Sequence, residues 1–364
     1  MEDIRRATRR YETWLGGLIP LVPADLRTKH VRMRLGPFLF MRATFYRWCQ
    51  LWHGRTRDLG DVARAAPVAA VGDLHLENFG TWRDSDGRLV WGINDFDETT
   101  TLPWTQDLVR LAASAHLAIY TDHLAVRRRS ACEAILEGYR DGVEAGGRPF
   151  VLEEMHGWLR DVATSELRHP ALFWRKMDGL RTAPDVDRGA AAAIAGAMPS
   201  ADLSIRYARR VAGLGSLGRP RFVGIADWHG GRIAREAKAM APSAWVWACG
   251  HSPDTVDRYT QIITRAVRVP DPTVKIVGGW LLRRLAPHCA RIELGDLPSG
   301  RDEERLLYAM GFETANVHLG TPRARAVLRR QLAARRGNWL HETAKTFAGD
   351  VVREWKEWRG AQRG

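Results

Sequence analysis

Two β-type runs, each followed by acidic residues, constrain this chain more than any other feature. The first run, residues 67–71, leads into GDLHLEN, in which Asp73 and Asn78 stand five residues apart, and the second, residues 89–93, leads into Asp95. A turn-forming Asp-Ser-Asp-Gly precedes the second run and predicts a hairpin that returns it beside the first loop. We therefore expect Asp73, Asn78 and Asp95 to converge.

Helical segments are expected mostly towards the two ends of the chain. Apolar residues recur three or four positions apart in 104–120, 125–144, 254–267, 303–320 and 323–347. Further β-type runs follow in the middle, at 209–214, 221–227, 232–238 and 280–285, with Gly-rich turns between several of them. The pattern predicts an α+β protein with a helical part and a β-rich part, since single cores stop growing near ~250–300 residues.

The segment 179–204 is rich in Ala, Asp, Gly and Pro, which favours a linker and a boundary near residue 205. We expect a helical part, 1–205, that carries the acidic residues. A β-rich part, 206–300, should follow, and the helices of 301–364 should pack back on the first part.

Composition limits the class of protein. Hydrophobic residues make up 45% and charged residues 27%, which excludes wholesale disorder. The 55 Lys and Arg residues outnumber the 42 Asp and Glu residues, and the net charge of +13 attracts polyanions such as nucleotides or nucleic acid. The first residues lack the apolar core of a leader peptide, no run is long enough to span a membrane, and the four cysteines form no CxxC pair. These features predict a cytoplasmic protein with reduced, buried cysteines.

The converging acidic residues match the needs of phosphoryl transfer. That reaction uses a carboxylate for the acceptor hydroxyl, here Asp73, and hard oxygen ligands for Mg²⁺, here Asn78 and Asp95. His75 is expected to orient the loop, and Asp97 is a possible further ligand. The alternative is that these residues only cap turns, as Asp and Asn often do.

A glycine-rich loop supplies a second signal. GLGSLG satisfies GxGxxG through Gly213, Gly215 and Gly218, with Ser216 between them. Because Arg-Pro and a β-type run follow it, in place of a helix, the loop does not fit a Rossmann site and favours a hairpin that covers phosphates. The third strand should then offer a cation, either Lys238 or Arg235, which would point to opposite faces.

The motifs GPFLFMRATFY, VGDLHLENFG, INDFDETTTLPWTQDLVRLAAS, VAGLGSLGRPRF and AREAKAMAPSA together resemble the bacterial DUF2252 family, which is grouped with the protein-kinase-like superfamily. The resemblance extends over residues 36–321 and implies a two-lobed kinase-like fold, with a small antiparallel β-rich lobe and a larger helical lobe. It also implies that Asp107 braces the catalytic loop. The family usually has Lys-Glu-Ala in the third strand, whereas this chain has Arg-Glu-Ala followed by Lys238.

The order of the motifs implies a circular permutation, since the glycine loop comes about 140 residues after GDLHLEN. Together these features predict an ATP-dependent, Mg²⁺-assisted phosphotransferase whose hydroxyl-bearing acceptor is unknown. The alternatives are a pseudokinase that binds nucleotide without transfer, and a basic nucleic-acid-binding protein. A two-metal phosphoesterase, suggested by Asp73 and His75, lacks the further ligand blocks that such enzymes need.

Overall fold

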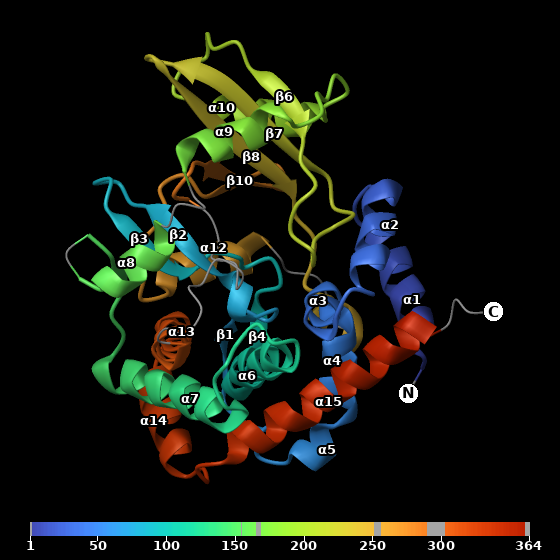
Figure 1. Cartoon of the computed structure of the whole chain (residues 1–364), viewed down its shortest axis with the longest axis vertical. Coiled ribbons are helices and arrows are strands. Elements are labelled where there is room, and N and C mark those ends of the chain that lie inside the picture. Colours follow the sequence, from blue (N-terminus) through green and yellow to red (C-terminus); the bar gives the residue numbers. More distant parts are fainter. Residues whose placement is uncertain (1, 154, 165–168, 251–255, 290–302, 361–364) are drawn as a thin grey trace.

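A computed structural model describes residues 2–153, 155–164, 169–250, 256–289 and 303–360. Figure 1 shows a helical body with a five-stranded sheet standing above it. About half of the chain is helical and 16% is strand, and the sheets are antiparallel, which confirms the α+β class. None of the described helices combines the length and the apolar composition needed to cross a membrane.

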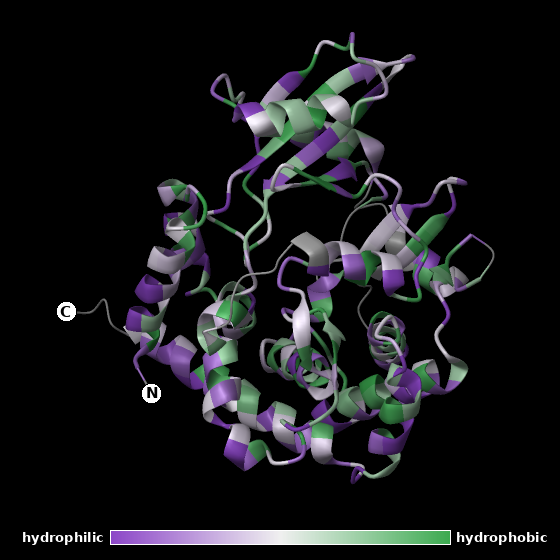
Figure 2. Cartoon of the chain, turned by 180° about the vertical axis from the view of Figure 1, so that it is seen from behind, coloured by the Kyte–Doolittle hydropathy of each residue, from purple (hydrophilic) through white to green (hydrophobic). Residues whose placement is uncertain are grey.

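The helical body draws on both ends of the chain. Its helices are α1 (Ile4–Gly16), α2 (Pro23–Arg32), α3 (Pro37–Ala43), α4 (Phe45–Gly54), α5 (Thr56–Leu59), α6 (Trp104–Tyr120), α7 (Arg128–Ala145), α8 (Gly157–Ala163), α11 (Ala244–Cys249), α12 (Val256–Arg265), α13 (Glu303–His318), α14 (Ala324–Ala333) and α15 (Trp339–Gly360). Their apolar sides turn towards one another (Figure 2) and form the main core. Helices α13, α14 and α15 pack on α6 and α7.

Two small sheets lie in the body at the base of the upper sheet. β1 (Pro67–Ala70) pairs with β4 (Thr100–Pro103), while β2 (Phe79–Arg83) pairs with β3 (Leu89–Ile93), which also pairs with β5 (Phe150–Val151). The β2–β3 pairing confirms the predicted hairpin, with Arg83 opposite Leu89. Asp84 closes its turn by accepting hydrogen bonds from the backbone N–H groups of Asp86 and Arg88.

The upper sheet has the order β6-β7-β8-β10-β9. Its strands are β6 (Arg206–Arg209), β7 (Arg221–Trp228), β8 (Gly231–Ala239), β9 (Lys275–Val277) and β10 (Trp280–Leu285). Because side chains alternate along a strand, the sheet buries two separate apolar faces. α10 (Arg188–Gly196) packs with Phe222 and Ala237 on one face, and α9 (Pro170–Asp178) packs with Val223 and Ala234 on the other.

The structure corrects the expected organisation in four places. The segment 179–204 is no plain linker, because it contains α10, and the layer on the sheet begins with α9, well before residue 205. The chain also leaves the sheet between β8 and β9 to form α11 and α12, which join the main core. The apolar run 209–214 is a loop, since β6 ends at Arg209, and the helix expected at 323–347 is broken after Ala333, near Gly337.

Helices α7 and α13 approach each other very closely in the body. A Cβ atom added to Gly138 would lie 1.9 Å from the Tyr308 carbonyl oxygen, and one added to Gly311 would lie 2.0 Å from that of Ile135. The two helices therefore approach backbone to backbone, and any side chain at these glycines would push them apart.

We predict that Gly138→Ala lowers the free energy of unfolding by about 1–3 kcal/mol or more, because overpacking forces the two backbones to shift. Gly349→Ala is the matched control, since Gly349 is exposed in α15 and its added Cβ would meet nothing within 4 Å. The control should gain about 0.5–1 kcal/mol from helix propensity. Urea unfolding followed by circular dichroism measures both, and equal effects at the two positions would contradict the packing argument.

Candidate functional site

The loop that follows β1 is held in place by Asp107 of α6. The backbone N–H groups of Val71 and Gly72 donate to its two carboxylate oxygens at 2.7 and 2.9 Å, and His318 Nε2 lies 3.1 Å from the same carboxylate. Gly72 has φ +83°, and a Cβ there would lie 2.3 Å from the Glu98 carbonyl oxygen. Only glycine fits this turn, so the direction of the chain into Asp73 is fixed.

Arg110, one helical turn beyond Asp107, receives the side chain of Asp73. Its Nε donates to Asp73 Oδ1 at 3.0 Å, and its Nη2 contacts the same oxygen and donates to the Met41 carbonyl at 3.0 Å. The guanidinium is fully buried and lies 4.9 Å from the ring centre of Phe45 and 4.8 Å from that of Trp48. These contacts fix the position of the Asp73 carboxylate.

Burial raises the pKa of Asp73 to about 7, although the neighbouring Arg110 pulls it down. The negative charges of Glu98 and Asp95 add to the upward shift. The Asp73 side chain keeps 16% of its surface exposed, on the side of a cavity described below. A carboxylate with this pKa, open on one side, meets the requirements of a general base at neutral pH.

Asn78 and His75 lock the short 3₁₀ turn (Leu76–Asn78) that ends the loop. Asn78 Oδ1 accepts a hydrogen bond from the His75 backbone N–H at 2.6 Å, and His75 Nδ1 accepts one from Glu77 at 3.2 Å. The Asn78 carbonyl accepts from the Asn94 backbone at 3.0 Å, which joins the loop to the end of β3. Asn78 Oδ1 thus has one lone pair committed to the turn and a second available for a metal ion.

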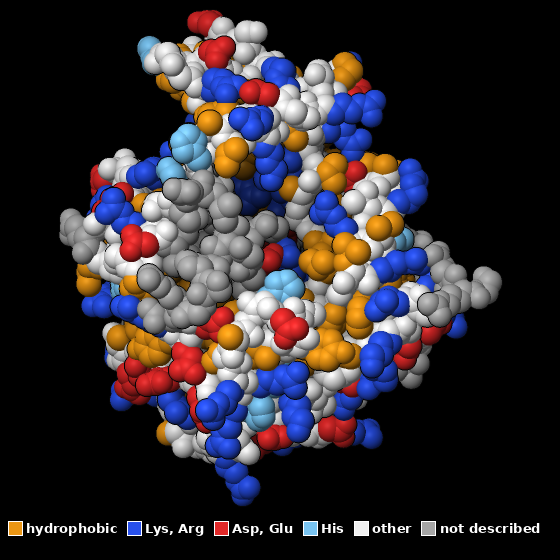
Figure 3. Space-filling model, in the orientation of Figure 1, with side chains coloured by type: hydrophobic (Ala, Val, Ile, Leu, Met, Phe, Trp, Pro, Cys, Tyr) orange, Lys and Arg blue, Asp and Glu red, His pale blue; other side chains and the backbone are white. Residues whose placement is uncertain are grey.

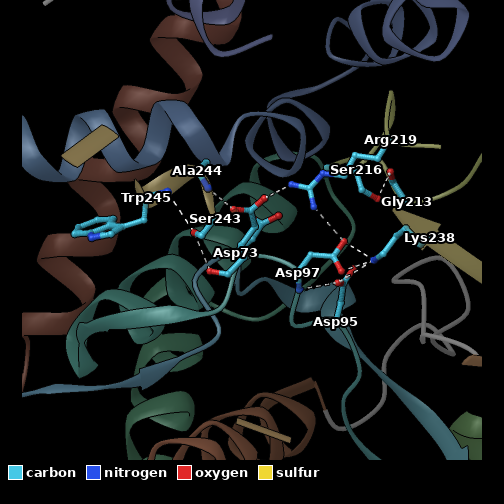
Figure 4. A network of polar contacts seen from close by, with 12 residues as sticks. Asp73, Asp95, Asp97, Gly213, Ser216, Arg219, Lys238, Ser243, Ala244 and Trp245 are labelled. Carbon is cyan, nitrogen blue, oxygen red and sulfur yellow. Dashed lines mark hydrogen bonds and ion pairs between the residues drawn. The ribbon is translucent and has the colours of Figure 1, made fainter. Parts of the chain in front are cut away.

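The two aspartates after β3 have different environments. Asp97 is buried and forms an ion pair with Lys238, whereas the Asp95 side chain is 40% exposed and lies 3.8 Å from the same ammonium group (Figure 4). Burial opposes ionisation of Asp97, but the positive charges of Lys238, Arg219 and Arg221 together outweigh it and lower the Asp97 pKa to about 2. Asp95 is therefore the carboxylate that remains accessible to a ligand.

Side chains alternate between the two faces of β8, so the two candidate cations lie on opposite faces of the strand. Lys238 is 1% exposed and points to Asp97, and its pKa is lowered by burial in spite of the two aspartates beside it. Arg235 points to the opposite face, where its Nε donates to the Ala197 carbonyl at 3.1 Å just beyond α10. Lys238 is the cation that the strand brings to the acidic residues.

The glycine-rich loop between β6 and β7 reaches down to Asp73. A Cβ added to Gly215 would lie 3.2 Å from Asp73 Oδ2 and 3.0 Å from the Arg42 carbonyl oxygen, so a side chain there would press on the carboxylate. Lys29 Nζ donates to the Gly215 carbonyl at 3.1 Å, and the Val22 backbone N–H donates to the Gly218 carbonyl at 2.8 Å. α2 and the residue before it thus hold the loop over the site.

Arg219, directly after the loop, ties it to the segment between β3 and β4. Its Nη2 donates to Glu98 Oε1 at 2.7 Å, and Glu98 Oε2 accepts a hydrogen bond from the Ala244 backbone at 2.6 Å (Figure 4). Ser243 Oγ donates to the Glu98 carbonyl at 3.0 Å. The upper sheet and the body are therefore joined by buried polar contacts next to Asp97.

Three arginines gather around one buried carboxylate on the underside of the sheet. Glu236 accepts from Arg221 Nη1 at 3.0 Å and from Arg283 Nε at 2.8 Å, and it also contacts Arg210. Arg221 Nη2 donates further to Ser216 Oγ at 2.9 Å, which links this group to the glycine loop. Burial opposes ionisation of Glu236, but the arginines hold its pKa well below the usual range. Three positive charges against one negative charge leave this surface positive.

A cavity of about 1130 Å³ lies between the glycine loop, the acidic residues and these arginines. Its lining includes Asp73, Asn78, Asp95, Gly215, Arg210 and Arg283. Figure 3 shows the hollow below the upper sheet, with Lys and Arg side chains in its depth and acidic side chains beside them. Ligand pockets commonly measure ~300–1,000 Å³, so the cavity is large enough for a nucleotide and part of a second molecule.

A family model described as "Uncharacterized protein conserved in bacteria (DUF2252)" matches residues 21–166. The match includes the acidic loop, the hairpin, Asp107 and Arg110, but ends before the glycine loop and β8. It covers less of the chain than the resemblance noted from the motifs. No curated protein and no solved structure matches the chain significantly.

Several residues of the site were not singled out from the sequence. Arg110 had a local signal, because it follows Asp107 by three positions and so shares its helix face. No local sequence pattern indicated the arginines around Glu236. They come from a loop and from two strands, and the sequence does not give the register of those strands. Asp97 was expected near a metal ion, and the structure places it against Lys238.

We predict that protonation of Asp73 makes folding pH-dependent between pH 4 and 7. Its pKa is about 7 in the folded chain and about 3.9 when unfolded, so the unfolded state loses its proton first and stability falls as pH rises through this range. In Asp73→Asn that contribution is absent. The unfolding free energy of the variant minus that of the wild type should therefore rise by about 1–3 kcal/mol from pH 4 to 7 and then level off. Urea titrations at each pH measure this difference, and parallel curves would contradict the assignment.

Proposed function

We propose that this chain is an ATP- and Mg²⁺-dependent phosphotransferase with a two-lobed, protein-kinase-like arrangement. The observation that carries the proposal is the position of Gly215 over Asp73, where an added Cβ atom would lie 3.2 Å from the carboxylate. It places a glycine-rich hairpin directly over a carboxylate whose pKa is raised to about 7, in a cavity that also contains an accessible aspartate. Phosphoryl transfer depends mainly on positioning and electrostatics, and these groups supply both.

Each group has a distinct role in the proposal. Asp73 positions and deprotonates the acceptor hydroxyl, and Arg110 holds its carboxylate. Asp95, with the free lone pair of Asn78 Oδ1, holds Mg²⁺, which prefers oxygen ligands. The arginines around Glu236 and the backbone of the glycine loop attract the phosphates from above.

The chain order supports a circular permutation of this arrangement. The acidic loop precedes the glycine loop, yet the strand, glycine loop, strand, turn and strand of β6–β8 face it across the cavity. The two ends of the described chain lie side by side in the helical body (Figure 1), where Arg5 Nη2 donates to the Trp358 carbonyl at 2.7 Å.

A second candidate function is a pseudokinase that binds nucleotide without transfer. The specific observation that favours it is the commitment of Lys238 to Asp97, which leaves no lysine of β8 on the cavity wall. In this reading the Arg210, Arg221 and Arg283 group takes over phosphate binding. The position of Asp73 beneath the glycine loop favours the active phosphotransferase.

We predict that MgATP raises the melting temperature, because a ligand at 100 times its Kd adds ~2.7 kcal/mol to the folded state. Asp95→Ala should lose the Mg²⁺-dependent part of this shift. Asp86→Ala is the matched control, since this aspartate lies exposed in the β2–β3 turn, and it should keep the full shift. Asp73→Asn should retain binding and lose any ATP hydrolysis or transfer. Differential scanning fluorimetry and a phosphate-release assay measure the two effects.

The outcomes of these assays separate the candidates. A shift without turnover supports the pseudokinase. The absence of any nucleotide-dependent shift with any divalent metal contradicts both functions. Salt-sensitive binding of DNA or RNA without nucleotide binding supports the basic nucleic-acid-binding protein instead.

We also predict that substitutions of the two candidate cations of β8, Lys238 and Arg235, change MgATP binding to different extents. Lys238→Met should weaken MgATP binding about tenfold or more, because Asp97 then keeps only the 3.9 Å contact with Arg219 and its poorly compensated negative charge repels the phosphates. Arg235→Met should leave MgATP binding unchanged, since Arg235 faces α10. Isothermal titration with MgATP tests the pair, and the reverse order would show that the register of β8 has been misassigned.

A further inference from the structure

A second cluster of metal-ligating side chains lies in the helical body, where α6, α7 and α15 meet. It consists of His116 from α6, Cys132 from α7 and His341 from α15. One nitrogen or sulfur atom of each side chain lies within 4.8 Å of the others. His116 and Cys132 are buried, and His341 is half-buried.

The contacts within the cluster leave one nitrogen unsatisfied. His116 Nε2 lies 3.3 Å from Cys132 Sγ, and the ring centres of His116 and His341 are 5.2 Å apart. His341 Nδ1 is buried and finds no hydrogen-bond partner among the described residues. A buried polar atom without a partner costs about 1–3 kcal/mol, so such an atom calls for a ligand.

We propose that His116, Cys132 and His341 form a binding site for a thiophilic transition-metal ion of the Zn²⁺ class, separate from the nucleotide cavity. A thiolate and two imidazoles are a ligand set typical of Zn²⁺ and related ions, and three protein ligands leave a fourth position for water. The ion would clamp α15 to α6 and α7.

The geometry requires only a small adjustment. Zn–S bonds of ~2.3 Å and Zn–N bonds of ~2.0–2.1 Å in a tetrahedron place the ligand atoms about 3.3–3.6 Å apart. The His116–Cys132 contact already has this length. The remaining pairs, within 4.8 Å, close by a movement of about 1 Å, which the half-buried His341 side chain at the start of α15 can supply.

The protonation states of these side chains are compatible with metal binding. Burial, with some help from His341, Arg128 and Lys345, lowers the pKa of His116 to about 4, so its imidazole is neutral at pH 7. Burial raises the pKa of Cys132 to about 12, so the metal-free protein carries the thiol. Binding breaks the S–H bond, forms the metal–sulfur bond and releases one proton to solvent, and the thiolate charge offsets the nearby cations.

Co²⁺ titration of the untagged full-length chain tests the site, because the absorption spectrum of bound Co²⁺ depends on the type and geometry of its ligands. We expect one thiolate-bound Co²⁺ per chain, with visible bands of a tetrahedral ion and near-ultraviolet charge transfer from thiolate. Cys132→Ser should remove the charge-transfer band, and His341→Asn should weaken Co²⁺ and Zn²⁺ binding at least tenfold. Cys249→Ser and His53→Asn are the matched controls, one a half-buried cysteine and the other an exposed histidine outside the cluster. Both should bind as the wild type does.

Thermal unfolding with and without Zn²⁺ provides the second readout. Zn²⁺ should raise the melting temperature of the wild type and both controls, but not of Cys132→Ser. If Cys132→Ser does not fold, the His341→Asn variant tests the site in its place. This variant is expected to fold, because His341 Nδ1 makes no hydrogen bond among the described residues that the substitution could remove. Absence of the charge-transfer band, or its survival in both cluster variants, would overturn the proposal. The charge-transfer band arises only from a thiolate ligand, and the Asp95 and Asn78 site has none, so this outcome does not depend on the proposed nucleotide site.

Discussion

Two fully buried charges on one turn of α6, Asp107 and Arg110, organise the centre of this molecule. A buried ion must be paired or hydrogen-bonded, and both of these reach the same loop. Asp107 accepts the backbone N–H groups at the start of that loop, and Arg110 binds Asp73 directly after them. The loop and the hairpin that follows it are positioned from this helix, and the glycine loop, which α2 holds, lies over the carboxylate that Arg110 fixes. The raised pKa of Asp73 has the same origin, because the packing that buries Arg110 also buries its partner.

The upper sheet meets the body through ion pairs as well as apolar contacts. Arg219 binds Glu98, and Lys238 binds Asp97, each linking a residue of the sheet region to the segment after β3. Desolvation offsets much of the favourable energy of such pairs, but removing one partner is costly. The pairs therefore fix the position of the sheet on the body more than they add to the stability of the fold. This mode of contact leaves a polar cavity between the two parts, lined by charges of both signs. A site for a phosphate and a divalent cation needs that mixture.

Local sequence patterns predicted the elements whose signals are strong. Residues 104–120 form α6 as expected, because apolar periodicity continues through the segment and Pro103 precedes it. The β2–β3 hairpin was expected because its turn residues favour it. The errors occurred where packing overrides local preference. The Ala-rich part of 179–204 reads as a linker, yet it forms α10 because the apolar face of the sheet gives it a surface to cover.

The sequence by itself determined that Asp73, Asn78 and Asp95 line one site. They stand close together in the chain, and one short loop and one hairpin are enough to bring them together. The tertiary structure decided everything that joins distant segments. Lys238 faces the acidic residues and Arg235 does not because of the register of β8, and side chains on a strand alternate strictly between its faces. The cluster of His116, Cys132 and His341 depends on how three helices pack, and no spacing along the chain encodes such a meeting.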